Sequence, residues 1–147
     1  MIPLVRVVAA AMFDREGRVL IAERPAGKHL AGRWEFPGGK VAPGESDAQA
    51  LERELEEELG VQMQAGSALM ELTHEYADRH VQLCLWVVEA FRGEPHGLDG
   101  QRLKWVRTDR LAAEDILEAD QPFIELLQRY TMQPYPSDRV SSHGIAT

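Results

Sequence analysis

Residues 38–61 read GGKVAPGESDAQALERELEEELGV, a glycine-rich turn followed by a segment with helical periodicity. Ser46 or Asp47 is a suitable cap for the start of this helix, and Gly60 is a typical stop signal. One face of the helix is apolar, so we expect it to pack against the core of the domain. The apolar stripe consists of Ala48, Leu51, Leu55 and Leu59.

The other face of this helix carries three glutamates. Positions three and four apart lie on the same side of a helix, so Glu54 lies beside Glu57 and Glu58. Like charges at this spacing repel each other. Two explanations are open: an acidic face in contact with solvent, or a set of oxygen ligands for a divalent cation. Such ligands suit Mg²⁺ or Mn²⁺ better than zinc.

The spacing of the whole segment favours the cation. Seven fixed residue types at this spacing would match a given start by chance about once in 10⁸. The pattern is identified as the Nudix box, the signature of the Nudix hydrolases, with every position filled. It runs Gly39, five residues, Glu45, seven residues, Arg53-Glu54-Leu55, one residue, Glu57-Glu58, one residue, Gly60-Val61.

Length and composition fit one ordinary domain. The chain has 147 residues, of which 44% are hydrophobic and 27% are charged, and its first residues do not combine a basic region with a long apolar run. We therefore expect a cytoplasmic protein without membrane contact, with a domain over residues 1–130 and a flexible tail over 131–147. Cys84 is alone, which excludes an intrachain disulfide, and we interpret it as a core residue rather than a nucleophile.

The charge balance limits the choice of partners. A net charge of −8 argues against a nucleic-acid polymer, because proteins that bind one usually carry a basic surface. It does not argue against a nucleotide, since a bound cation inverts the local sign where phosphates must lie. We expect a monomer or a weak dimer.

Hydrophobic patterns elsewhere predict strands and two further helices. The strand at 81–91 is apolar on both faces, which indicates cover on both sides and a layered α/β domain. A short helix is expected after Thr108-Asp109, and Asp120 is a suitable cap for a last helix that ends at Tyr130. Strands are predicted at residues 4–13, 19–23, 69–76, 81–91 and 103–106, the first two as a hairpin, with 63–66 as a connector.

The chain resembles Nudix hydrolases to about residue 130, and most closely the MutT branch, which hydrolyses 8-oxo-dGTP. The resemblance implies a single α/β/α domain with a mixed sheet sandwiched between helices. It also implies a Mg²⁺-dependent diphosphatase, in which Mn²⁺ can substitute, that releases a monophosphate and pyrophosphate and so cleans the nucleotide pool and avoids mutation. Beyond the box it rests on Arg24, the run Trp34–Lys40, the turn Asp78-Arg79-His80, the segment Gly93-Glu94-Pro95, and Asp120 with Pro122.

By resemblance, the box supplies the metal site. The metal ligands would be Glu54, Glu57 and Glu58, together with the backbone carbonyl of Gly38. Arg53 would hold carboxylates of the box in place by charge-assisted hydrogen bonds. The remaining roles are anchoring of the loop or a second metal for Glu45, phosphate contact for Lys40, and structural positions for Gly39 and Gly60.

The general base is open between two carboxylates. Glu54 is one candidate, and Asp99 is the other, because it stands where the MutT branch carries a further acidic ligand or base. Asp99 is equally well explained as a turn residue before Gly100.

Base recognition is open as well. The resemblance places Arg24, Phe36, Arg79 and Asp120 at the substrate. The ring of Phe36 could equally belong to the core, and a core position is what we expect for Trp34. The MutT enzyme has Asn where this chain has Asp120, and an ionised carboxylate only accepts hydrogen bonds. Related CTP and 5-methyl-dCTP diphosphatases carry Asp here, so a pyrimidine nucleotide is the alternative substrate.

Three further alternatives follow from the same residues. The basic loop 24–33 is either a solvated loop or a cationic lip for the substrate. A Nudix fold can also bind nucleotides as a sensor without turnover, although such domains usually have a degraded box. Finally, the box reads only the diphosphate, so ADP-ribose or a dinucleoside polyphosphate is also a possible substrate.

Overall fold

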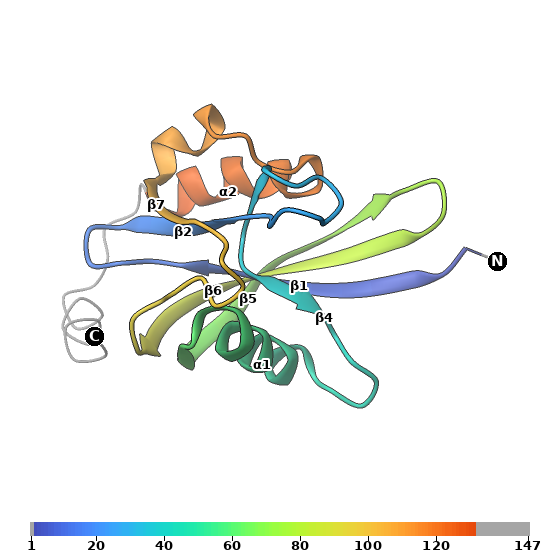
Figure 1. Ribbon diagram of the computed structural model, residues 1–147, viewed down its shortest axis with the longest axis horizontal. Coiled ribbons are helices and arrows are strands. Elements are labelled where there is room, and N and C mark those ends of the chain that lie inside the picture. The colour runs from blue at the N-terminus through green and yellow to red at the C-terminus, as the bar shows by residue number, and fades with distance from the viewer. Residues whose placement is uncertain (1, 132–147) are drawn as a thin grey trace.

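Two β-sheets form the frame of the computed structural model, which describes residues 2–131. The larger sheet has the strand order β4-β1-β6-β5, and the smaller one has the order β3-β2-β7 (Figure 1). In the larger sheet β1 and β6 are parallel, whereas β4 and β5 are antiparallel to their neighbours, so this sheet is mixed. The strands are β1 (Leu4–Met12), β2 (Arg18–Glu23), β3 (Trp34–Glu35), β4 (Gly38–Lys40), β5 (Gln62–Glu75), β6 (His80–Arg92) and β7 (Leu103–Arg107).

Helices cover the mixed sheet on both faces, as the family resemblance implied (Figure 1). One face of β1 and β6 packs against α1 (Asp47–Leu59), and the other packs against α2 (Gln121–Thr131) and the smaller sheet. Two short 3₁₀ helices, η1 (Thr108–Ala113) and η2 (Glu118–Asp120), lead into α2. No helix among residues 2–131 is both long and apolar enough to cross a membrane.

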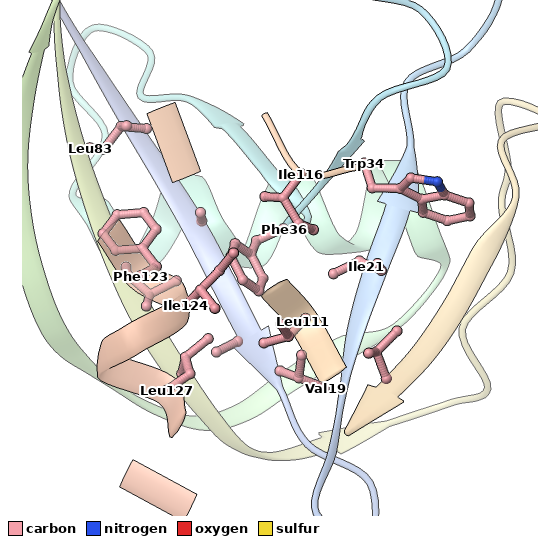
Figure 2. Packing of buried hydrophobic residues seen from close by; sticks show 14 of the residues in the cluster. Val19, Ile21, Trp34, Phe36, Leu83, Leu111, Ile116, Phe123, Ile124 and Leu127 are labelled. Atoms are coloured by element: carbon pink, nitrogen blue, oxygen red, sulfur yellow. The ribbon is translucent and has the colours of Figure 1, made fainter. Parts of the chain in front are cut away.

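Strand alternation divides the core into two apolar clusters. Val8 and Met12 point toward α1, whereas Ala9 and Ala11 point the other way. Figure 2 shows the second cluster, in which Phe36 from the segment after β3 lies among side chains of α2 and the smaller sheet. Because β6 contributes to both clusters, the expectation that it is covered on both faces is confirmed.

The ends of α1 follow the sequence signals. The Ser46 side chain accepts a hydrogen bond from the Gln49 N–H, and the Oε1 of Gln49 accepts one from the Ser46 N–H, which completes a capping box. Gly60 adopts a left-handed conformation with φ of 71° and ends the helix. The acidic helix is therefore fixed at both ends by local sequence.

The predicted hairpin of the first two strands is wrong. β1 and β2 are joined by a tight turn, but beyond one bridge between Phe13 and Val19 they diverge into different sheets. β1 instead pairs in parallel with β6 over nine residue pairs on one edge and with β4 on the other.

Other local predictions also need correction. The presumed connector 63–66 belongs to β5, because pairing with β6 recruits these residues through several irregularities in register. The glycine-rich segment contains β4, which the sequence analysis did not predict. The helix at 108–113 is a 3₁₀ helix whose N-cap position falls on Arg107, not on Thr108 or Asp109. Cys84 is buried as predicted, and the tail assigned to 131–147 lies almost wholly outside the described residues.

Candidate active site

Two consecutive glycines let the box loop pass closely over β1 and α1. Gly38 has a φ of 153°, and a Cβ there would lie 2.0 Å from the carbonyl oxygen of Val8. At Gly39 the space of a Cβ is filled by the Glu54 carboxylate, whose atoms would lie 2.4–2.6 Å from it. Glycine is thus required at both positions, at the first by backbone and at the second by a functional side chain.

Arg53 gathers carboxylates of the box on one guanidinium. Its Nε and Nη2 donate to the two oxygens of Glu45 at 2.7 and 2.9 Å, and its Nη1 donates to Glu54 at 2.9 Å. Nη1 also lies 3.3 Å from Glu57, and Nη2 donates to the Lys40 carbonyl at 3.0 Å. Arg53 therefore ties α1 to the loop that precedes it.

Glu45 serves as the anchor of that loop. Besides its paired contact with Arg53, its Oε1 accepts the Ala42 N–H at 2.8 Å. The hydrogen bonds from Arg53, with that from Ala42, lower the pKa of Glu45 to about 2. A bidentate guanidinium contact of this kind fixes orientation as well as charge.

Glu58 stands in a contrasting environment. Its Oε2 accepts the Gly38 N–H at 3.2 Å, while the side chain is largely enclosed. Burial raises the pKa of Glu58 to about 8, and the charges of Glu54, Glu35 and Asp99 add to this effect. Several negative charges therefore converge on one carboxylate that holds a proton at neutral pH when no cation is present.

These residues line one pocket of about 420 Å³. Its floor is apolar and comes from the inner face of β1 and β6. Glu57 is not part of the wall, because its contact with Arg53 keeps it at the surface with 60% of its side chain exposed. The polar lining residues form two groups by their place in the chain: the box and the loop between β6 and β7 contribute Lys40, Glu54, Glu58, Asp99 and Gln101, and other segments contribute Glu23, Arg24, Lys28, Glu35, Tyr76, Arg79 and Asp120.

Asp120 is the buried polar residue of the second group. Its side chain is almost inaccessible, and its Oδ2 accepts the Phe36 N–H at 3.3 Å. Burial raises the pKa of Asp120 to about 7, helped by the charge of Glu35 and opposed by Phe36 and Arg24. A carboxyl group with this pKa exists in both protonation states near neutrality and can donate as well as accept hydrogen bonds.

The other residues predicted at the substrate have different environments. Arg24 donates to Glu35 at 3.0 Å and to the His29 carbonyl at 2.7 Å, and both Arg24 and Lys28 line the pocket. Arg33 of the same basic loop pairs with Asp115 instead and does not line the pocket, so a cationic lip stays a prediction for Arg24 and Lys28. Arg79 lines the pocket and lies 4.8 Å from the ring of Tyr76.

Phe36 and Trp34 belong to the core. The ring of Phe36 is 3% exposed and meets Phe123 edge-on at 6.3 Å (Figure 2). Its backbone N–H, not its ring, makes the observed contact with Asp120. A stacking role for Phe36 therefore stays a prediction, whereas the core position of Trp34 is confirmed.

The oxygen donors at the box fit a hard divalent cation. Glu54 and Glu58 line the pocket beside Gly38, and all of these donors are carboxylate or carbonyl oxygens, which suit Mg²⁺ or Mn²⁺. Within residues 2–131, no three His, Cys, Asp or Glu side chains already stand in ligating positions. Arg53 holds Glu54 and Glu57 by hydrogen bonds from its Nη1.

Several pocket residues were not singled out from the sequence. Glu35 lies within the run that carries the resemblance, but only its contact with Arg24 shows that it faces the pocket. Tyr76 lies just after β5, and Lys28 lies in the loop after β2. Only the tertiary fold brings these two residues to the pocket. Gln101 gave no signal in the sequence, because its contacts join the loop between β6 and β7 to the end of α1.

We expect the metal-free protein to lose stability as pH rises from about 5 to about 8. The pKa of Glu58 is raised from 4.5 to about 8 in the folded state, so folding takes up a proton between these two pH values. The resulting contribution to the free energy of unfolding is fully present below pH 4.5 and is lost as the pH rises through about 8. Asp120 acts in the same direction. Melting curves recorded with chelator should show that Tm falls on the order of 10 °C between pH 5 and pH 8. This fall should be smaller when Mg²⁺ is added, and smaller in the Glu58→Gln variant. A Tm that stays level or rises over this range contradicts the assigned environment.

Comparisons with known proteins agree with this geometry. Residues 8–126 match the NUDIX domain family. The 8-oxo-dGTP diphosphatase of Escherichia coli (strain K12) is 38% identical over 124 residues, which cover 84% of this chain and 96% of that protein. The CTP pyrophosphohydrolase of the same organism is 40% identical over 118 residues, with coverages of 80% and 87%. A solved structure from a study of MutT of Aliivibrio salmonicida and Vibrio cholerae superposes with a TM-score of 0.75 at 36% identity, with coverages of 84% and 96%.

Proposed function

The chain belongs to the Nudix domain family, and on that premise we propose that it is a Mg²⁺-dependent diphosphatase that hydrolyses 8-oxo-dGTP. The products are the nucleoside monophosphate and pyrophosphate, and the setting is the cytoplasmic nucleotide pool. One observation carries the proposal: a single pocket holds the carboxylates of the box together with a buried carboxyl group that can contact a base.

At the box, the chain's own residues set up the phosphate end. Glu54, Glu57, Glu58 and the Gly38 carbonyl would hold Mg²⁺, which neutralises phosphate charge and lowers the pKa of bound water. Arg53 keeps Glu54 and Glu57 in place, and Lys40 lines the pocket where an anionic phosphate can reach it. Glu54 and Asp99 both line this pocket, and both remain candidates for the group that takes the proton from water.

Among the pocket residues outside the box, Asp120 provides the contact with the base. 8-Oxoguanine presents an N7–H donor beside the O6 acceptor, which a protonated carboxyl can match with one accepted and one donated hydrogen bond. The raised pKa of Asp120 supports this arrangement, since it removes the repulsion between a fixed carboxylate and O6. Asp120 can thereby do what an amide does at this place.

CTP is the second candidate substrate. The similarity to a CTP pyrophosphohydrolase at 40% identity favours it, and so does the residue type at position 120. An ionised Asp120 would accept a hydrogen bond from the N4 amino group of cytosine. The two substrates differ in their pairing with this one carboxyl, so its protonation state distinguishes them.

A nucleotide panel with Mg²⁺ tests the proposal. We expect 8-oxo-dGTP to be hydrolysed fastest, with pyrophosphate detected directly and no orthophosphate unless a pyrophosphatase is added. Release of orthophosphate would contradict a diphosphatase, and rapid turnover of ADP-ribose would contradict the assigned substrate. Binding of nucleotides without any turnover would instead make the domain a sensor.

Substitution of Asp120 should separate its two chemical roles. We expect Asp120→Leu to lower kcat/KM for 8-oxo-dGTP by about 10²-fold, because up to two hydrogen bonds to the base are lost in a buried site. Asp120→Asn should keep most of the activity at pH 6 and exceed the wild type above pH 7, where the native carboxyl ionises and stops donating. Parallel pH profiles of the wild type and the Asn variant would refute this role. Asp109→Asn, at an exposed aspartate in η1, is the matched control.

A further inference from the structure

The loop between β6 and β7 is fastened to the end of α1. The His96 N–H donates to the Leu59 carbonyl and the Leu98 N–H to the Glu58 carbonyl, each at 3.0 Å. Carbonyls at the C-terminus of a helix have no partner within the helix, so this loop satisfies groups that would otherwise need water. The loop that carries Asp99 is thus docked directly behind Glu58.

One side chain completes this docking. The Oε1 of Gln101 accepts the Asp99 N–H at 2.9 Å, while its Nε2 donates to the backbone carbonyl of Glu58 at 3.3 Å. A primary amide can make both contacts at once, because it has an acceptor and donors on one planar group. Gln101 therefore connects the residue at the tip of the loop with a carboxylate-bearing residue of the box.

The turn that Gln101 closes has little freedom. The Gly100 N–H donates to the Gly97 carbonyl at 2.9 Å, and a Cβ at Gly97 would lie 2.0 Å from the carbonyl oxygen of Gln101. Asp99 itself is exposed, so local burial does not hold it. Its place in the pocket depends on the turn and on the amide of Gln101.

We infer that Gln101 is a positioning residue that fixes Asp99 against the Glu58 end of the active site. This inference rests on the proposed function, in which Asp99 is a further carboxylate for the cation or the attacking water. The amide orients the main chain of Asp99, and that orientation determines where the carboxylate projects. Gln101 makes no contact with substrate in this account and acts only through Asp99.

A double-mutant cycle tests whether Gln101 acts through Asp99. Gln101→Met keeps the size of the side chain and removes both hydrogen bonds, so we expect kcat to fall about 10-fold or more with KM little changed. Asp99→Asn should lower kcat further, and adding Gln101→Met to it should have no additional effect. Gln64→Met, at an exposed glutamine in β5, is the matched control and should leave kcat unchanged.

The outcomes separate positioning from general stability. The inference would be overturned if the fold losses of kcat in the two single variants multiplied in the double variant. It would also be overturned if Gln101→Met had the kcat of the wild type. Mn²⁺ affinity, measured by calorimetry on the nucleotide-free protein, gives a second readout: Gln101→Met and Asp99→Asn should weaken it equally and not cumulatively. If the wild type hydrolyses no nucleotide, the proposed function fails, and this metal-binding cycle alone decides the role of Gln101. Unchanged Mn²⁺ affinity in Gln101→Met would then overturn it.

Discussion

Replacing Glu54 with glutamine is expected to lower kcat by about 10²–10⁴-fold without unfolding the protein. The Glu54 carboxylate lines the pocket, lies against Gly39 and accepts a hydrogen bond from Arg53 at 2.9 Å. Glutamine has the same shape and still accepts from Arg53, so the fold persists. It lacks the negative charge that ligates a cation or takes a proton from water.

Steady-state kinetics with 8-oxo-dGTP and Mg²⁺, accompanied by thermal melting, measure this effect. The matched control is Glu56→Gln, which removes an equal charge from the exposed side of the same helix and should leave kcat within about twofold. If the Glu54 variant keeps a tenth of the wild-type activity or more, Glu54 is not a member of the catalytic site.

The two adjacent glycines are expected to differ in how much stability their replacement with alanine costs. Gly38→Ala should destabilise the protein by about 3 kcal/mol or more, because the new methyl group meets the Val8 carbonyl and the Cα of Ala9, and φ of 153° disfavours a side chain. The same change would displace the N–H that Glu58 accepts. Stability and activity should fall together.

Gly39→Ala should spare the fold and impair the chemistry. The three atoms nearest to the methyl group there all belong to the end of the flexible Glu54 side chain, which can turn away at small cost in stability. The carboxylate would then leave its place in the pocket, so kcat should fall at least 10-fold while Tm changes little. Denaturant unfolding and kinetics on the two alanine variants measure this contrast. Equal losses of stability in both would contradict the placement of Glu54.

Sequence reasoning found the parts of the site that are local in the chain. The capping of α1 by Ser46, its stop at Gly60 and the placement of Glu54 and Glu58 on one pocket depend on residues within one helix and its ends. For the same reason, the contact of Arg53 with Glu45 could be expected from the motif that contains both.

Features set by distant pairing could not be read in this way. β1 pairs with β6, which lies 76 positions further along the chain, whereas β2 pairs with β3 and β7 in the other sheet. Burial of Asp120 against Phe36 and the bridge from Gln101 to Glu58 likewise join segments brought together only by the fold. A single sequence records no such neighbours, and the raised pKa values of Asp120 and Glu58 follow from them.

An internal competition assay tests the central claim most directly. The wild-type enzyme is given 8-oxo-dGTP, dGTP and CTP together with Mg²⁺, and the decay of each nucleotide gives the ratio of kcat/KM values without separate fits. We predict that 8-oxo-dGTP is consumed at least 100-fold faster than either competitor, which corresponds to about 2.7 kcal/mol of differential transition-state binding. Preferential consumption of CTP would contradict the account and assign Asp120 to the recognition of cytosine.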